Sequence, residues 1–227
     1  MTAGARRAPP RTRASKAARR GQLIAATLAA LEQKGLAALT LADVADAAGL
    51  SRGIVNFHFE SKDKLLFATL VQLSEDYARN WRAELAAAGP TPAERMRALI
   101  AADLAEAICT PQTVAAWFAF FAEAAARPDF RDLCWARDDA YLEAIREVCA
   151  ALDREAGYGI DPAATATAIY AMQEGLWLRL MMGNAEIDRD AALAIALGML
   201  GNLFPRHFAR DGAVLPRGHA LSPPSGR

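Results

Sequence analysis

One stretch, from Thr40 to Leu66, constrains the fold of this chain more than any other. Apolar side chains recur after Thr40 at spacings of three and four residues, the pattern of an amphipathic helix. Thr40 stands where a helix N-cap belongs, and Asp43 follows three residues later, where its carboxylate can bond back to the first turn. Gly49 suits a left-handed helix end, and Ser51 is placed to cap a second helix. The stretch therefore predicts two short helices joined by a tight glycine turn.

The charge distribution along the chain separates this stretch from the rest. The formal net charge is zero, but residues 1–66 hold 11 Lys and Arg against 5 Asp and Glu. The remainder, residues 67–227, holds 15 basic and 21 acidic side chains. A basic N-terminal module is thus followed by an acidic body, and a basic module of this size is typical of a part that binds nucleic acid.

The rest of the chain predicts an all-α fold of about nine helices, because Ala and Leu dominate and no segment alternates as a strand would. The N-terminal module should comprise three helices, the first of them from Arg19 to Lys34. A helix over 92–109 and a last one over 189–208 are also expected. The predicted organisation is a disordered basic arm at 1–18, a helix-turn-helix domain at 19–66, a helical domain at 67–208 and a flexible tail at 209–227.

Several classes of protein are excluded by what the sequence lacks. The only histidines are His58, His207 and His219, and no Ser/His/Asp or Cys/His group can be assembled around them, so we expect no enzyme. The three cysteines have no metal-ligand spacing, and we expect no metal and no cofactor. No apolar run approaches the roughly 20 residues of a membrane span, and no secretory signal precedes the first helix. We therefore expect a cytoplasmic protein without membrane contact.

The opening stretch resembles the DNA-binding domain of the TetR family of bacterial transcription repressors. The resemblance covers roughly residues 19–67 and rests on the A-A-G-L-S turn at 47–51, Gly53, the His58-Phe59 pair and the S-K-D-K-L-L run at 61–66. In the body, W-F-A-F-F-A-E at 117–123 and E-G-L-W-L-R at 174–179 resemble BetI-type regulators, which respond to choline. Two departures are Glu174, where Asp is more usual, and Asn56, where Tyr is more usual; the second bears on base preference.

The resemblance implies a homodimer that places two recognition helices in successive major grooves of a palindromic DNA operator, about 34–36 Å apart. Arg52 can then pair with guanine and Asn56 with adenine, while Gly53 allows close approach of the backbone. The remaining predicted contacts are to phosphate. The predicted DNA-binding set is Thr40, Ser51, Arg52, Gly53, Asn56, His58 and Lys62. The last two helices resemble the family's dimer helices, with apolar surface from Ile169, Met172, Leu176, Leu180, Leu193, Ala196, Leu197 and Leu200.

A second candidate site lies in the body. Tyr170, Glu174 and Trp177 fall on one stripe of the helix that begins after Asp161, so that a carboxylate stands between two aromatic rings. Aromatic faces attract quaternary ammonium groups, and a nearby carboxylate offsets the ligand's charge. The predicted ligand-binding set is Trp117, Phe118, Phe121, Tyr170, Glu174 and Trp177. Ordinary core packing of these rings is the alternative.

The function expected from all of this is a ligand-responsive repressor released from DNA by choline or another organic cation. Two alternatives remain open: a related regulator whose inducer is a polyamine or an apolar metabolite, and an activator or a DNA binder controlled by a protein partner.

Overall fold

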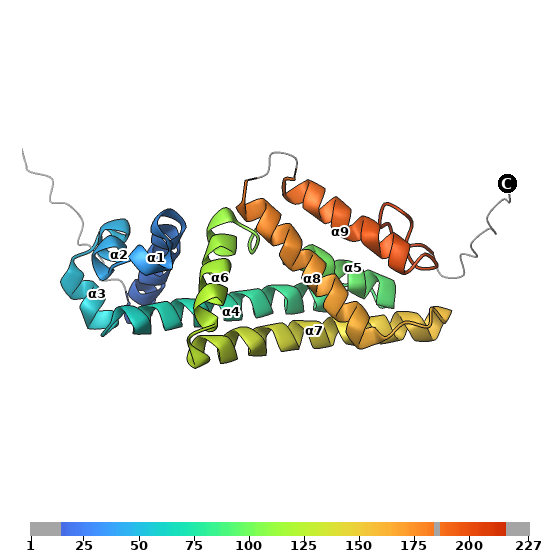
Figure 1. Ribbon diagram of the computed structural model, residues 1–227, viewed down its shortest axis with the longest axis horizontal. Helices are drawn as coiled ribbons and strands as arrows, with labels where there is room; N and C mark the ends of the chain where they lie inside the picture. Colours follow the sequence, from blue (N-terminus) through green and yellow to red (C-terminus); the bar gives the residue numbers. More distant parts are fainter. Residues whose placement is uncertain (1–14, 184–186, 217–227) are drawn as a thin grey trace, which may run out of the picture.

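The computed structural model of the protein describes residues 15–183 and 187–216. These residues fold into nine α-helices, which confirms the all-α prediction (Figure 1). The helices are α1 (Lys16–Ala38), α2 (Leu41–Ala48), α3 (Arg52–His58), α4 (Lys62–Ala87), α5 (Pro92–Asp103), α6 (Pro111–Ala124), α7 (Pro128–Ala156), α8 (Pro162–Met181) and α9 (Arg189–Leu203). The molecule is elongated, with α1, α2 and α3 grouped at one end and the remaining helices extending from them.

The N-terminal unit is a small bundle with its own core. α2 packs on α1 and on α3, and α1 packs on the first turns of α4. Each of these four helices contributes at least one side chain with no exposed surface: Leu23, Val44, Val55 and Leu65. Burying each such side chain contributes roughly 1.5–3 kcal/mol, which holds the short helices α2 and α3 in place although neither would be stable alone.

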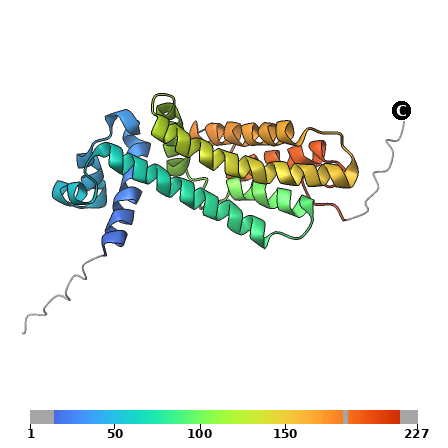
Figure 2. The ribbon, with the colours of Figure 1, turned by 90° about the horizontal axis from the view of Figure 1, so that it is seen from below.

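The helix α4 joins this unit to the body. Ser61 caps it, since its hydroxyl accepts a hydrogen bond from the N–H of Lys64 at 3.2 Å. Leu65 at its start is buried in the N-terminal unit, whereas Tyr77 and Trp81 near its end are buried in the body. Helix α7 runs beside α4 along the long axis (Figure 2). A second connection is made by α6, which packs on α1 as well as on α7 and α8.

The core of the body is unusually aromatic. Its largest side chains with no more than 2 % of their surface exposed include Tyr77, Trp117, Phe120, Phe130 and Tyr141, drawn from α4, α6 and α7. Tyr77 meets Trp117, Tyr141 and Trp177 edge to face, with ring centroids 5.6–6.4 Å apart. Such pairs add about 0.5–1.5 kcal/mol to the energy of burial. Within the described residues no helix is long and apolar enough to cross a membrane.

The first helix differs from its prediction at both ends. It begins at Lys16 because the Ser15 hydroxyl accepts a hydrogen bond from the N–H of Ala18 at 3.1 Å, so part of the expected arm is helical. The remainder of that arm, residues 1–14, lies outside the described residues. Gly35, which can adopt a positive φ, has a φ of 69° and kinks the helix, but helical structure resumes to Ala38.

Two further boundaries differ. The helix expected over 92–109 ends at Asp103, where the chain turns and the carbonyl of Ala105 accepts hydrogen bonds from Ile108 and Cys109. The last helix, expected to reach residue 208, ends at Leu203. The chain then folds back, so residues 209–216 are not the loose tail expected: Leu215 N–H donates to the carbonyl of His207 at 2.9 Å. The rest of that tail, from residue 217, lies outside the described residues.

Candidate functional site

The turn between α2 and α3 is closed by a hydrogen bond from the N–H of Leu50 to the carbonyl of Ala45 at 2.9 Å, and the start of α2 is held by the capping residues that the sequence predicts. Thr40 Oγ1 accepts from the N–H of Asp43 at 3.2 Å, and Asp43 Oδ2 accepts from the N–H of Thr40 at 2.9 Å, which completes a capping box. An ion pair with Lys34 at 2.6 Å, together with the Thr40 bonds, lowers the pKa of Asp43 to about 2. Gly49 ends α2 with a φ of 62°. The orientation of α3 relative to α2 is therefore set by this segment itself.

Helix α3 buries one side and exposes the other. Val55 is fully buried, whereas Ser51, Arg52, Gly53 and Asn56 are exposed. This is the arrangement needed if the predicted base-contacting side chains are to reach a groove. One detail of the prediction is wrong: Ser51 occupies the N-cap position, but its side chain makes no capping hydrogen bond.

Sequence reasoning overlooked Phe57 on the same exposed face. Its side chain is 77 % exposed, the highest value among the large apolar side chains of the described residues. It lies four residues after Gly53, the spacing of one helix face, and this spacing was the available signal. An exposed aromatic ring is costly in water but can contact the methyl group of thymine.

Two of the predicted phosphate contacts are engaged within the protein. The Lys62 ammonium donates to the carbonyls of Leu36 at 2.8 Å and Ala37 at 3.3 Å, so it ties the start of α4 to the end of α1. A lysine ammonium has three donors, which leaves one for a phosphate. His58 is half-buried and meets Phe57 edge to face, with ring centroids 5.3 Å apart.

His58 also lines a cavity of about 680 Å³ where the N-terminal unit meets the body. Arg127, at the start of α7, crosses this junction and donates to Asp63 of α4 at 3.0 Å. Its guanidinium also lies 3.9 Å from the ring centroid of Phe130. Beside the cavity, Phe67 of α4 meets Phe130 of α7 edge to face at 6.0 Å, so the junction combines an ion pair with apolar contacts.

In the body, the structure brings most of the predicted ligand-binding rings together, but it places an arginine among them. The Cζ of Arg137 lies 4.1 Å from the ring centroid of Trp117, 4.8 Å from that of Tyr77 and 5.2 Å from that of Phe121. These distances are those of cation–π contacts. The predicted aromatic cage is thus already occupied by a cation of the same chain. Phe118 lies beside this cage and meets Phe121 edge to face at 6.0 Å.

Arg137 is held by polar partners as well. Its Nε donates to Asp138 at 2.6 Å, and its Nη2 donates to the hydroxyl of Tyr170, which itself donates to Asp138 at 2.8 Å. Arg137 is 7 % exposed as a residue, and its Nη1 has no hydrogen-bond partner. Sequence reasoning missed this residue, although a signal existed: Arg137 falls on the otherwise apolar stripe of α7, three residues after Cys134 and four before Tyr141.

Acidic groups surround this cluster. Asp103 is 3 % exposed, and burial raises its pKa to about 6. Its Oδ1 accepts from the Tyr77 hydroxyl at 2.8 Å, while its Oδ2 is buried without a partner. The pKa of the half-buried Glu174 is also raised, first by burial and then by Asp138. Trp177 donates to the backbone carbonyl of Asp103 at 3.2 Å, so this ring is a core side chain as well as a candidate contact.

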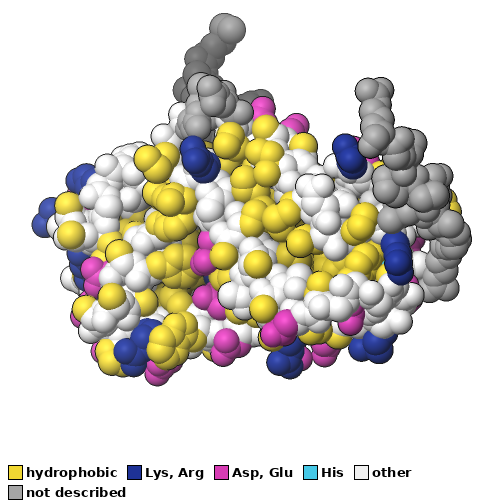
Figure 3. Space-filling view, turned by 45° about the vertical axis from the view of Figure 1, so that its right-hand side comes forward, with side chains coloured by type: hydrophobic (Ala, Val, Ile, Leu, Met, Phe, Trp, Pro, Cys, Tyr) yellow, Lys and Arg dark blue, Asp and Glu magenta, His cyan; other side chains and the backbone are white. Residues whose placement is uncertain are grey.

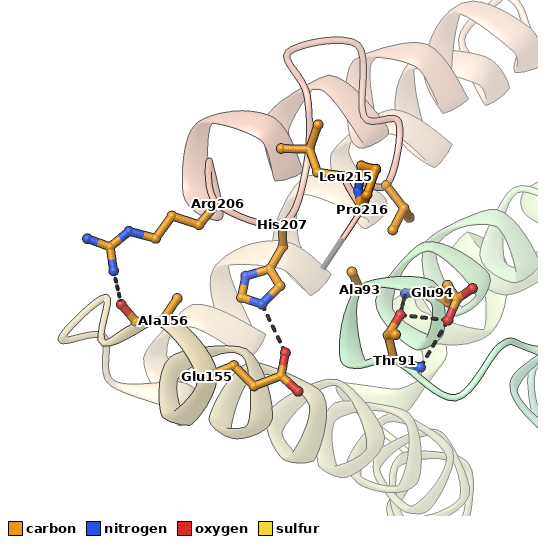
Figure 4. Close-up of a pocket in the computed structure, with 10 residues that line it drawn as sticks. Thr91, Ala93, Glu94, Glu155, Ala156, Arg206, His207, Leu215 and Pro216 are labelled. Atoms are coloured by element: carbon orange, nitrogen blue, oxygen red, sulfur yellow. Dashed lines mark hydrogen bonds and ion pairs between the residues drawn. The ribbon is translucent and has the colours of Figure 1, made fainter. Parts of the chain in front are cut away.

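Another cavity, of about 540 Å³, lies at the far end of the body (Figure 4). His207 Nε2 lies 3.1 Å from Glu155 Oε2, and the Arg206 guanidinium donates to the carbonyl of Ala156. Across the cavity, Thr91 and Glu94 form the capping box of α5. The contacts of His207 with Glu155 and of Arg206 with Ala156 join the last turn of α7 to the segment after α9. Among the described residues, no group of three or more His, Cys, Asp or Glu could hold a metal ion.

Comparison with known proteins divides the chain as the fold does. A family model for bacterial regulatory proteins of the tetR family matches residues 23–69, and one for the C-terminal part of BetI-type transcriptional repressors matches residues 92–205. The HTH-type transcriptional regulator BetI of Burkholderia thailandensis is 33% identical over 181 residues, covering 78% of this chain and 89% of the relative. That of Paraburkholderia phymatum is 35% identical over 184 residues, with the same coverage of 78% and 89%.

Solved structures share the fold at lower identity. A transcriptional regulator from Pseudomonas aeruginosa PAO1 superposes with a TM-score of 0.74 at 24% identity, over 86% of this chain and 94% of that one. A transcriptional regulator from Saccharomonospora viridis, solved in complex with choline, has a TM-score of 0.70 at 20% identity, over 80% of this chain and 94% of that one.

Proposed function

The chain belongs to the tetR family of bacterial regulatory proteins and is a transcriptional repressor of the BetI type, not an enzyme, and from this premise we propose that it binds a palindromic operator as a homodimer in the cytoplasm. Regulators of this family bind operator DNA and small-molecule effectors and form dimers. The observation that carries the proposal is the exposed polar face of α3, presented by a turn that Gly49 and the hydrogen bond from Leu50 to the carbonyl of Ala45 hold in place. We assign residues 19–66 to DNA binding and 67–208 to effector binding and dimerisation.

On DNA, α3 enters the major groove and its exposed face meets the bases. Arg52 donates to guanine and Asn56 pairs with adenine, while Gly53 lets the backbone approach. The N–H groups that follow Thr40 and Ser51 point at phosphate, as those at helix N-termini do. His58 and Lys62 contribute further phosphate contacts beside their contacts within the protein.

Operator binding tests this assignment. Arg52→Ala should weaken the complex with a selected palindrome by about 1–3 kcal/mol and relax the preference at one base pair, because a bidentate contact is lost. Lys62→Ala should weaken all DNA alike and make the salt dependence shallower by about one charge. Lys64→Ala is the matched control, since Lys64 pairs with Glu60 in its own segment. If Lys62→Ala leaves the salt slope unchanged, its ammonium serves only the contact with α1.

For dimerisation we propose the outer faces of α8 and α9, with a different set of residues from the one expected. Five of the apolar side chains named from sequence, Ile169, Leu176, Ala196, Leu197 and Leu200, are buried within the subunit. The exposed apolar side chains lie elsewhere on these helices or directly after α8: Leu178, Met181, Met182 and Ile195. Ala168, Ala171 and Gly175 continue the exposed face of α8 and allow close helix approach. Hydrophobic side chains also gather over the middle of the face seen in Figure 3.

As effector we propose a small organic cation of the choline type, recognised in the body by the aromatic rings and carboxyl groups around Tyr170, Glu174 and Trp177. The support is the chemistry of this region, which combines cation–π geometry with acidic groups. The related S. viridis regulator is described in complex with choline. Polyamines and apolar metabolites are the competing classes of effector.

The effector proposal is tested by measuring operator binding of the wild-type protein against choline, betaine aldehyde, spermidine and an apolar control. We expect choline-type cations to weaken the complex, and the operator to weaken choline binding by the same factor, because coupling is reciprocal. Release by the apolar compound alone would contradict the proposed class.

A further inference from the structure

We propose that the aromatic cage of the body is a cation site whose resting occupant is Arg137 of the same chain, and that an effector cation binds there by displacing this guanidinium. The inference rests on the proposed effector class, and it adds that Arg137 competes with the effector cation and so sets the affinity of the cage for it. It is carried by the position of the Arg137 Cζ within 4.1–5.2 Å of three ring centroids, which an external quaternary ammonium would need to approach in the same way.

Arg137 is bound well enough to fill the cage, but its binding is incomplete. Nε and Nη2 have partners, yet Nη1 is buried with none, although burying a donor without a partner is unfavourable. An arginine of a structural ion pair would satisfy its whole planar fork. The site therefore suits a cation but does not fit a guanidinium fully, as expected of an occupant that gives way.

The charge around the cage favours entry of a second cation. Three carboxyl groups, Asp103, Asp138 and Glu174, act electrostatically on one guanidinium. Asp103 leaves one oxygen buried without a hydrogen-bond partner, so an incoming quaternary ammonium can approach a carboxyl group to which Arg137 makes no hydrogen bond. Asp138 is 19 % exposed at its side chain, and can remain paired with Arg137 while the guanidinium moves toward solvent.

Displacement of Arg137 would change contacts outside the cage, because its side chain joins four helices. Its side chain leaves α7, meets rings of α4 and α6, and bonds Tyr170 of α8. Helix α6 packs directly on α1 of the N-terminal unit, and α4 runs into that unit. Exchange of the internal cation for an external one would therefore alter contacts on both helices that lead to the DNA-binding end (Figure 1).

Because Arg137 competes for the cage, the apparent affinity for an external cation is the intrinsic affinity multiplied by the fraction of molecules in which the cage is free. Arg137→Ala removes it and should tighten binding of tetramethylammonium at least about tenfold. Binding is measured on the full-length protein by calorimetry and by tryptophan fluorescence, at constant ionic strength. Arg146→Ala is the matched control, since Arg146 is an exposed arginine of the same helix that pairs with Glu143; it should bind as wild type does.

A second variant keeps the test decisive if Arg137→Ala does not fold. Arg137→Met keeps an unbranched side chain among the rings but removes the charge, and should also bind tetramethylammonium more tightly than wild type, though less so than Arg137→Ala. In addition, methylguanidinium should raise the melting temperature of Arg137→Ala more than that of wild type, because it refills the cage.

The outcomes separate this inference from the proposed function. If both variants fold and bind tetramethylammonium no more tightly than wild type, the displacement is overturned, even where choline releases wild-type protein from its operator. If the variants bind more tightly but no cation releases wild-type protein, the resident cation is supported and the proposed effector class fails.

Discussion

Asp103 is the residue whose environment departs most from that of an ordinary carboxylate. It is buried, it is bonded to Tyr77 through one oxygen only, and its pKa is raised to about 6 because burial opposes its ionisation. In the unfolded chain this carboxyl group has its ordinary pKa of 3.8. Between these values the folded protein holds a proton that the unfolded chain has lost, so the stability of the fold decreases as pH rises from about 4 to about 6. The raised pKa of Glu174 acts in the same direction.

The fully buried position of Asp103 makes this effect measurable. The shift of about two units corresponds to a loss of up to about 3 kcal/mol across the window. Asp103→Asn keeps an oxygen for the Tyr77 hydroxyl and cannot ionise, so the decrease should largely disappear. Urea denaturation at pH 4.5 and pH 7 measures both proteins. Asp190→Asn, which removes an exposed carboxyl, should behave as wild type; an equal decrease in Asp103→Asn would contradict this account.

At the scale of elements, the α2–turn–α3 segment is the part that local interactions specify most completely. A capping box starts α2, and a glycine in the left-handed conformation ends it. The N–H of Leu50 then donates to the carbonyl of Ala45 at 2.9 Å and closes the turn. Two glycines in this segment have different roles, because Gly49 has a positive φ and Gly53 lies within a helix.

The two glycines form a matched pair of variants. Gly49→Ala should destabilise the fold by about 1–2 kcal/mol, the cost of a left-handed alanine. Gly53→Ala should stabilise α3 by about 0.5–1 kcal/mol, because the added methyl group would meet only Ser51 Oγ at 3.8 Å. Operator binding should nevertheless weaken in Gly53→Ala, since the methyl group stands between α3 and the groove. Urea denaturation and fluorescence anisotropy with labelled operator separate these effects; unchanged affinity in Gly53→Ala would remove the close-approach role.

At the scale of the whole molecule, the DNA-binding end and the body meet through α4, through the contact of α6 with α1, and through Arg127. The pair between Arg127 and Asp63 lies beside the junction cavity, and Asp63 is 70 % exposed. An ion pair this exposed adds little to stability. Because this ion pair spans the junction, we expect it to fix the position of the start of α7 relative to the start of α4.

Arg127→Met tests this consequence. The aliphatic chain can still cover Phe130, but the pair with Asp63 is lost. We expect operator affinity to change by less than about 1 kcal/mol and the effector-induced loss of affinity to become smaller, because the two ends are less tightly coupled. The ratio of operator dissociation constants with and without saturating choline is the measurement. Arg131→Met, whose ion pair stays within α7, should leave this ratio unchanged.

Assembly is the other property of the whole molecule. Ala171→Arg places a charge at the centre of the exposed face of α8 and should give a monomer in sedimentation at micromolar concentration, because a buried unpaired charge is unfavourable. Affinity for a palindromic operator should fall with it. Ala83→Arg on the exposed side of α4 is the control. A dimeric Ala171→Arg protein would place the interface elsewhere.

The sequence by itself determined the helical class, the two ends of α2 and the turn that follows it, because each depends on residues within a few positions of one another. Thr40 with Asp43, and Gly49, act on the adjacent backbone, and the structural consequences of both were predicted. The residues of α3 were named from their hydrogen-bonding chemistry and from the family resemblance; Arg52, Gly53 and Asn56 are exposed, and Phe57 was overlooked.

Only the tertiary structure decided what occupies the aromatic cage. Arg137 reaches rings on α4 and α6 and a hydroxyl on α8, contacts between residues 16 to 60 positions apart in the chain. Such contacts arise from the packing of helix faces against one another. The spacing of residues within one helix does not specify which of its side chains enters the space between three other helices. The same reason explains why Lys62 bonds the end of α1 and why the predicted dimer residues on α8 and α9 are in part the core of the subunit.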